Sequence, residues 1–97
     1  MENLRVSNIM INGKGVNNQY WIHYNEGGCH YQIFQSYESM VLKMKDWEII
    51  EVGSEWDASR TTEKYRNKVT GMDKKHFKKM LDEDFKWNEE TQSYLRK

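Results

Sequence analysis

The sequence has no proline and only one cysteine, Cys29, among its 97 residues. A lone cysteine cannot form an internal disulfide, which excludes a small secreted scaffold held by bridges and favours a reducing compartment, so we expect a cytoplasmic protein. Long hydrophobic runs are also missing. Polar residues interrupt the first segment at Glu2, Arg5 and Asn8, so it lacks the continuous hydrophobic run of a signal peptide. No stretch approaches the roughly 20 apolar residues of a membrane span.

Neither sign of charge is in excess. Lys and Arg together number 15, and Asp and Glu together also number 15. This balance excludes a uniformly basic coat for nucleic acid and an acidic tail protein. Any role for charge must therefore come from local patches.

Large aromatic side chains take the place of aliphatic ones. Hydrophobic residues make up only 37% of the chain, but it holds four Trp, six Tyr and three Phe. Each large ring buries about 150 to 250 Å² on folding, so these rings supply much of a thin core. A second core is not expected at this length, and we predict a single domain spanning residues 1–97.

The first half of the chain has the pattern of an antiparallel β-meander. Apolar residues recur through residues 4–11 and 20–24, and each run is followed by a cluster of Asn and Gly that favours a turn. In the next strand Tyr31 and Ile33 alternate with Gln32 and Phe34, which gives one hydrophobic and one mixed face, typical of a sheet with one face in water. Further strands are predicted over residues 40–44 and 47–52.

The apolar spacing changes from two to three or four after Trp56. This spacing predicts a helix over residues 61–70, capped by Ser59 or Thr61 and ended by Gly71.

A second helix begins at its cap Asp73 and carries an apolar stripe of Phe77, Met80 and Leu81. Residues 88–92 then read as the loop of a closing hairpin. The predicted fold class is α+β: an antiparallel β-meander of about five strands, followed by two short helices and a C-terminal β-hairpin.

A resemblance to a known group of proteins covers roughly residues 30–72. Its residues are Phe34-Gln35-Ser36-Tyr37 with Val41, and then Glu55-Trp56-Asp57-Ala58-Ser59-Arg60-Thr61-Thr62-Glu63-Lys64-Tyr65. Together they resemble small uncharacterised bacteriophage and prophage proteins with a Trp-Asp-Tyr-Ser-x-Thr-Thr-x-Lys-Tyr motif. The chain departs from the motif at Ala58, where the pattern has an aromatic residue, and at Val69-Thr70, where it has Phe-Leu. The resemblance implies a phage origin, and small phage proteins often inhibit host defence systems, as anti-CRISPR proteins do.

The residues show no arrangement typical of an enzyme or a metal site. His23, Cys29 and His30 are residue types that zinc prefers, but Cys29 and His30 are adjacent and point to opposite faces of a strand. The same geometry argues against a Cys-His nucleophilic pair, which would also need a third group to orient it. We therefore predict no catalytic residue, no metal and no cofactor.

A run of five carboxylates extends from Asp46 to Asp57 with no Lys or Arg among them. Acid-base or Mg²⁺ chemistry needs two of them on one face, whereas strand alternation predicts Glu48 and Glu51 on opposite faces. An acidic edge in water is the simpler interpretation, and such an edge also imitates phosphate charge toward a basic partner. The acidic candidates for partner binding are Glu51, Glu55 and Asp57.

Two aromatic residues are further candidates for partner binding. Trp21 and His23 share one face of a predicted strand, opposite Tyr20 and Ile22. Most rings must form the core, but a thin domain leaves some exposed, and exposed Trp and Tyr are enriched at interaction hot spots.

Positive charge is concentrated in residues 60–80, which hold eight Lys or Arg against two Asp or Glu. Such residues solubilise an outer helix face, or they bind nucleic-acid phosphate. Hydroxyl groups at the start of the first helix serve as caps, or they help to hold an anion. The candidates for anion or nucleic-acid binding are Ser59, Arg60, Thr61, Thr62, Lys64, Lys74, Lys75, Lys78 and Lys79.

The sequence thus predicts a phage-type accessory protein that acts by binding, and that inhibits a host protein such as a component of a defence system. The alternative is a small nucleic-acid-binding module that uses the basic segment 60–80. No membrane partner is expected. An open edge strand of the meander allows a homodimer.

Overall fold

The computed structural model describes residues 1–97 and contains one seven-stranded sheet and two helices. Five strands form an antiparallel meander: β1 (Glu2–Ile11), β2 (Lys14–Glu26), β3 (Cys29–Ser36), β4 (Ser39–Lys45) and β5 (Glu48–Gly53). The helices α1 (Arg60–Thr70) and α2 (Lys74–Asp84) follow, and then the hairpin of β6 (Phe85–Asn88) and β7 (Ser93–Arg96). The predicted α+β class, with its meander, two helices and closing hairpin, is confirmed.

The closing hairpin extends the sheet of the meander. The strand order is β1-β2-β3-β4-β5-β7-β6, because β7 pairs antiparallel with β5. The hairpin loop has four residues, 89–92, and is one shorter than predicted because Asn88 pairs with Ser93 as part of the ladder.

Local sequence signals set the helix ends as expected. The Ser59 hydroxyl accepts the backbone N–H of Thr62 at the start of α1, and Gly71 ends that helix in the left-handed conformation, with φ of 72°. The Asp73 carboxylate accepts the backbone N–H of His76 at the start of α2. These contacts satisfy backbone groups that a helix end leaves unpaired.

One face of the sheet, here called the covered face, packs against both helices. Trp21, Phe34 and Leu42 lie side by side on it in register, followed by Val52 of β5. The helices contribute rings and aliphatic side chains to the same core. Its buried members are Ile9, Phe34, Val41, Leu42, Met44, Ile49, Val52, Tyr65, Phe77, Leu81 and Phe85.

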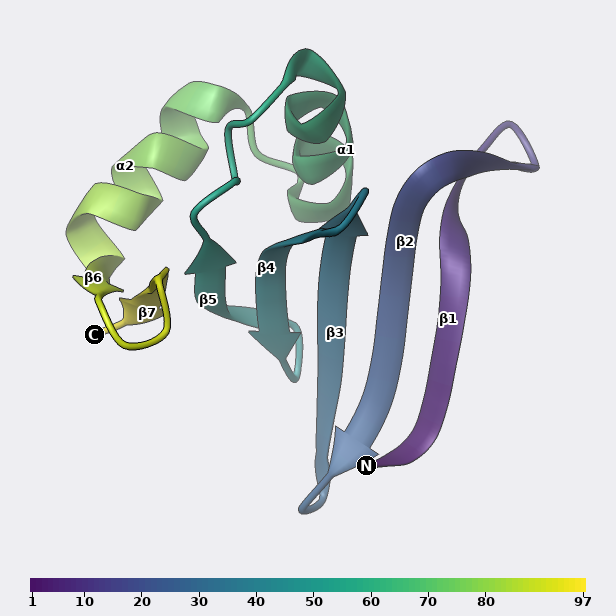
Figure 1. Ribbon diagram of the computed structural model, residues 1–97, viewed down its shortest axis with the longest axis horizontal. Coiled ribbons are helices and arrows are strands. Elements are labelled where there is room, and N and C mark those ends of the chain that lie inside the picture. The colour runs from purple at the N-terminus through teal and green to yellow at the C-terminus, as the bar shows by residue number, and fades with distance from the viewer.

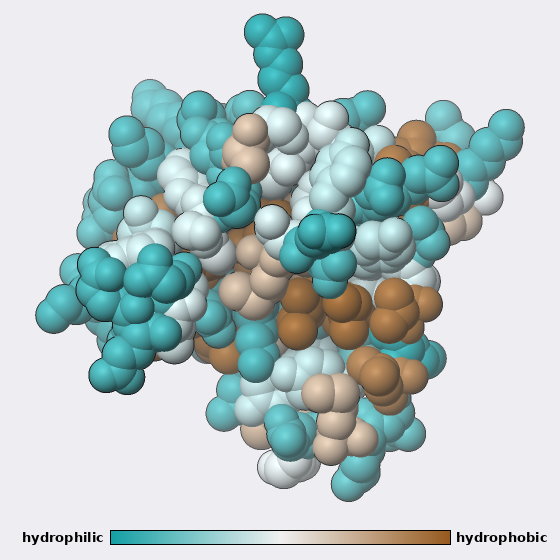
Figure 2. All heavy atoms as spheres, in the orientation of Figure 1, coloured by the Kyte–Doolittle hydropathy of each residue, from teal (hydrophilic) through white to brown (hydrophobic).

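The other face, here called the open face, has no helix against it. Val6, Ile22 and Ile33 lie on it in register across β1, β2 and β3, and Lys43 and Glu51 continue the row on β4 and β5. Figure 2 shows this apolar row as a brown band across the strands nearest the N-terminus. Hydrophobic surface therefore remains in contact with solvent on this side.

The burial of β3 differs from the sequence prediction. On its mixed face Gln32 and Phe34 are fully buried, whereas Ile33 on the more hydrophobic face is only half-buried. The neighbouring strands explain the difference, because β4 and β5 present Leu42 and Val52 to one side but Lys43 and Glu51 to the other. The helices cover the side that is apolar across several strands.

The helices cover only part of the sheet. Figure 1 shows α1 and α2 across its upper end, while the lower parts of β2 and β3 extend beyond them. The lower part of the covered face is therefore not packed against a helix.

Neither helix has the length and apolar character needed to cross a membrane.

Candidate functional site

Four aromatic side chains meet on the covered face at and beyond the edge of the helices. Trp21 and His23 come from β2, His30 comes from β3, and Trp47 lies in the two-residue turn between β4 and β5. Ring centroids are separated by 5.3 Å for Trp21 and His23, 5.4 Å for His23 and His30, and 5.7 Å for His30 and Trp47. We call these four residues the ring cluster.

Hydrogen bonds orient the two imidazoles of the ring cluster. The backbone N–H of Trp47 donates to Gln32 Oε1 at 3.3 Å, and Gln32 Nε2 lies 2.7 Å from His30 Nδ1. An amide nitrogen can only donate, so His30 Nδ1 accepts and the proton of the neutral ring is on Nε2. That Nε2 lies 3.3 Å from His23 Nδ1, which accepts in turn. This chain of bonds couples the turn at Trp47 to His23.

His23 in the ring cluster is held uncharged at neutral pH. Burial lowers the pKa of His23 below its ordinary 6.5, and the positive charges of His30 and Arg5 lower it further. Arg5 is the residue of β1 directly opposite His23. Protonation of His23 at Nδ1 would also set its N–H against the N–H of His30. A neutral imidazole at His23 is therefore maintained beside Arg5.

Trp47 has an unusual position for a large residue. Its side chain is 64% exposed, and its φ of 69° follows a φ of 49° at Asp46. Two left-handed residues in succession form the tight hairpin turn in which glycine normally takes the second place, since a side chain there costs on the order of 1 to 2 kcal/mol. Asp46 Oδ1 supports the turn by accepting the backbone N–H of His30 at 2.9 Å. Core packing does not account for an indole in this place.

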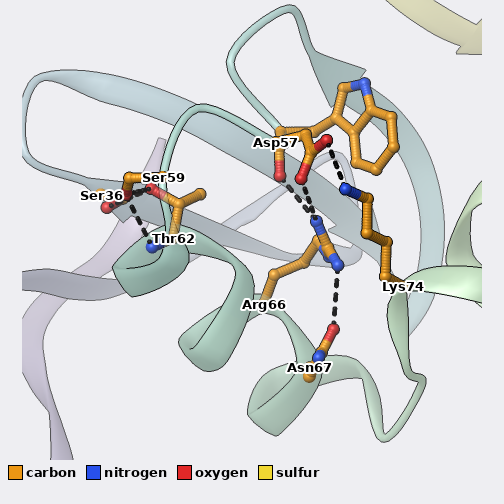
Figure 3. Close-up of polar contacts among 8 residues, drawn as sticks. Ser36, Asp57, Ser59, Thr62, Arg66, Asn67 and Lys74 are labelled. Atoms are coloured by element: carbon orange, nitrogen blue, oxygen red, sulfur yellow. Dashed lines mark hydrogen bonds and ion pairs between the residues drawn. The ribbon is translucent and has the colours of Figure 1, made fainter.

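The acidic candidates lie away from the ring cluster and from one another. Glu51 is on the open face, where it accepts the Ser93 hydroxyl at 2.7 Å. Asp57 joins the two helices, because its carboxylate lies 3.0 Å from Lys74 Nζ and 4.0 Å from Arg66 Nη1 (Figure 3). Glu55 is exposed in the loop before α1. Of the five residues predicted to bind a partner, the structure brings together only Trp21 and His23.

The predicted separation of Glu48 and Glu51 onto opposite faces is wrong. Glu48 pairs with Lys45 and Glu51 pairs with Lys43, and these lysines are two residues apart on one face of β4. The ladder shifts at this point because β5 has an extra residue, Ile50, which forms a bulge. The two carboxylates have separate partners: Glu48 Oε1 lies 3.4 Å from Arg96 Nε, and Glu51 Oε2 accepts the Ser93 hydroxyl.

The motif run after β5 forms a structural junction, which Figure 3 shows in detail. Ser59 caps α1, and the Thr62 hydroxyl is buried 3.1 Å from the Ser36 hydroxyl of β3. Two hydroxyls of the predicted anion group are thus engaged within the fold, while Thr61 is exposed. Ala58 is exposed as well, so this position contributes nothing to the core.

Arg66 organises the same junction from inside. Its side chain is fully buried, and Nη1 donates to the carbonyl oxygen of Trp56 at 2.8 Å while Nη2 donates to Asn67 Oδ1 at 3.0 Å. The guanidinium carbon lies 5.2 Å from the Trp56 ring and 4.7 Å from the Phe77 ring. This residue ties the loop before α1 to both helices.

The basic candidates divide into engaged and free side chains. Lys74 pairs with Asp57, and Lys64 Nζ lies 5.4 Å from the centre of the Tyr65 ring. Arg60 is exposed near the start of α1. The remaining lysines of α2 are exposed without an acidic partner: Lys75, Lys78 and Lys79.

Sequence reasoning missed the place of His30 and Trp47 in the ring cluster, and the hydrogen bonds by which Gln32 orients it. The signal was present in the two-residue Gly27-Gly28 turn, which fixes the register of β2 and β3 and so places His23 diagonally next to His30. The two histidines share a face, yet no group of three or more His, Cys, Asp or Glu side chains is placed to hold a metal ion.

In comparisons with protein-family models, with curated proteins and with solved structures, nothing matches this chain. The function therefore has to be argued from the geometry of the protein's own surface.

Proposed function

We propose that this protein acts by binding another protein through the ring cluster, and that it performs no chemistry of its own. The observation that carries the proposal is Trp47, an exposed indole held in a left-handed turn position. Strained residues persist where the surrounding structure holds them for a purpose, and they concentrate at functional sites. Trp is also the residue type most enriched among interface hot spots.

The surroundings of Trp47 support a role in protein binding. Packing against His30 limits the freedom of the indole, so little further entropy is lost when a partner covers it. The neutral imidazole of His23 carries no charge that a partner would have to desolvate, while Arg5 at the margin offers a polar contact. A flat aromatic centre with a charged rim is typical of protein interfaces.

The kind of partner follows from the resemblance described above. Small phage proteins commonly block a host protein, so we propose a bacterial host protein, such as a component of a defence system, as the target. The protein would then work in the host cytoplasm. Inhibition requires only that the ring cluster cover a surface which the target needs.

Replacement of Trp47 by glycine gives a sharp test, because glycine suits the turn. The immobilised full-length chain is exposed to lysate of a phage-infected bacterium, and proteins retained by the wild type are identified by mass spectrometry. We expect Trp47→Gly to lose the retained protein while its thermal stability stays equal or rises. Purified partner should then bind this variant at least about tenfold more weakly than the wild type, and its activity should fall when the wild type is added.

Tyr37→Gly is the matched control. Tyr37 is also an exposed aromatic residue in a left-handed turn position, with φ of 55° and 54% exposure, but it lies in the turn between β3 and β4. Binding should survive this change. Equal binding by Trp47→Gly and the wild type, or retention of no protein at all, would contradict the proposal.

A nucleic-acid-binding function is the second candidate, favoured by the free ammonium groups of Lys75, Lys78 and Lys79 on one helix. Phosphate contacts make the affinity fall steeply with salt, by nearly one power of the salt concentration for each neutralised phosphate. A titration of DNA and RNA at increasing ionic strength therefore separates the two functions. Unchanged binding after replacement of Lys74, Lys75, Lys78 and Lys79 by Gln would exclude this candidate.

A further inference from the structure

β1 is an open edge of the sheet. It pairs with β2 on one side only, and Figure 1 shows its other side free along the margin of the molecule. Six large hydrophobic side chains of the protein are exposed, and four of them belong to the first ten residues: Met1 at 72%, Leu4 at 56%, Val6 at 60% and Met10 at 52%. Exposed edges act as templates for pairing with another strand.

The two edges of the sheet are protected to different degrees. The far edge, β6, has four residues including Lys86, and it follows directly from α2. β1 has ten residues with neither Lys nor Pro among them. Short length and lysine are common means of blocking edge pairing, so β6 is better shielded than the longer β1.

An apolar row runs to this open edge. Val6, Ile22 and Ile33 lie in register on the open face, and Val6 is its outermost member. Next to the row is a hollow of about 800 Å³, lined in part by Val6, Tyr20 and Tyr37. Within β1, the ladder with β2 is regular from Arg5 to Asn8, between two register shifts. The row and the regular segment share Val6.

We propose that two copies of this chain pair antiparallel through β1, about a two-fold axis at Val6. Such an interface uses the same patch on both copies. Val6 of one copy then lies beside Val6 of the other, and Arg5 lies directly opposite Ser7, with the two Arg5 side chains in diagonal positions across the axis. The two apolar rows become one continuous row across the joined sheets. Both ring clusters lie on the same side of this dimer, beginning one strand in from the interface, at Trp21 and His23 of β2.

Charge complementarity favours a second copy as the occupant of β1. In the pairing about Val6, the extra residue of β1 between Glu2 and Arg5 brings Glu2 of one copy beside Ile9 of the other, next to Met10. Lys68 Nζ reaches over from α1 to Met10 and donates to its carbonyl oxygen at 2.9 Å. Glu2 shares the covered face with its partner Asn25 on β2, which is the side from which α1 approaches. The symmetry therefore brings a carboxylate and an ammonium group together twice.

The oligomeric state of the purified full-length chain tests this pairing directly. Sedimentation equilibrium over a wide concentration range should show a reversible dimer. Val6→Lys puts two ammonium groups on the two-fold axis and should weaken the dimer at least about tenfold. Trp47→Lys is the control, since it changes an exposed hydrophobic residue outside the interface and should leave the dimer intact. A monomer at every concentration, or a dimer insensitive to Val6→Lys, would overturn the proposal.

A charge exchange tests the register. Glu2→Lys and Lys68→Glu should each weaken the homodimer by about fivefold, because each sets like charges together twice. An equimolar mixture of the two variants restores both attractive pairs, so it should form a heterodimer of wild-type strength. Failure of the mixture to associate better than either variant alone would refute this pairing. The measurements need no binding partner, so their outcome is independent of the function proposed for the ring cluster.

Discussion

On the covered face of the sheet, Phe34 and Leu42 pack beside Gln19 and Gln32, and all four side chains are fully buried. On the open face, Val6 stays 60% exposed although it lies in a row of aliphatic side chains. The face with more polar residues on β2 and β3 is therefore the one that folding removes from water. The hydrophobic pattern of a single strand does not decide which side is buried.

The two faces differ in burial because the position of the helices is set by β4 and β5. Helices follow β5, and they pack where β4 and β5 present a continuous apolar surface. The polar residues of β2 and β3 on that side are buried with it. Buried amides are costly unless they are hydrogen-bonded, and Gln32 is satisfied by His30 and Trp47 whereas the Gln19 amide has no partner. The open face keeps apolar residues that are available for association.

The largest expected change in stability comes from substituting neighbouring residues on opposite faces of β3. Phe34→Ala should lower the free energy of unfolding by about 3 to 5 kcal/mol, because it empties a fully buried site. Ile33→Ala, one residue away on the open face, should cost about 1 kcal/mol. Urea unfolding at low protein concentration measures both. Similar losses for the two variants would show that the open face is as well packed as the covered one.

Substitution of Arg66 tests whether this buried charged side chain stabilises the contact between the loop before α1 and the two helices. Arg66→Ala should destabilise the protein by about 3 kcal/mol. The change removes two hydrogen bonds and the guanidinium that packs against the rings of Trp56 and Phe77. Arg60→Ala, an exposed arginine on the same helix, should change stability by less than about 0.5 kcal/mol. Equal urea midpoints for the two variants would count against a structural role for Arg66.

Substitution of Gln19 on the covered face should raise the stability of the protein rather than lower it. Gln19→Met keeps a similar volume but removes an amide that is fully buried without a hydrogen-bond partner, so it should raise stability by about 1 kcal/mol. Gln35→Met on the open face is the control. There the amide donates to the Tyr37 carbonyl oxygen at 2.7 Å, so no gain is expected. Loss of stability in Gln19→Met, measured by thermal unfolding, would mean that the Gln19 amide is satisfied in solution.

Much of the fold was predictable because local signals act over a few residues. The alternation of β1 to β5, the caps Ser59 and Asp73, and the glycine at position 71 each act within one turn or one strand. The start of α1 at Arg60 lies one residue before the predicted start. The attachment of β7 to β5 and the choice of the covered face depend on contacts between distant segments. No periodicity in the sequence records them.

The ring cluster was predictable only in part. Strand alternation placed Trp21 and His23 together, since that inference needs one strand alone. Their meeting with His30 and Trp47 depends on the register of two hairpins. Single-residue bulges shift such registers, as Ile50 shows on β5. The alternation rule gave a wrong result for Glu48 and Glu51 for the same reason.

The smallest expected effect is a pH dependence at the free end of the covered face. Burial and the charges of His30 and Arg5 lower the pKa of His23 in the folded protein, so the unfolded chain binds more protons as the pH falls below 6.5. Stability should therefore be full above that pH and should decline below it, down to the lowered pKa of the folded state. Urea midpoints between about pH 8 and pH 5 measure this slope, which His23→Gln should reduce. An equal slope in His23→Gln and the wild type would show that burial and the neighbouring charges do not keep His23 neutral in mild acid.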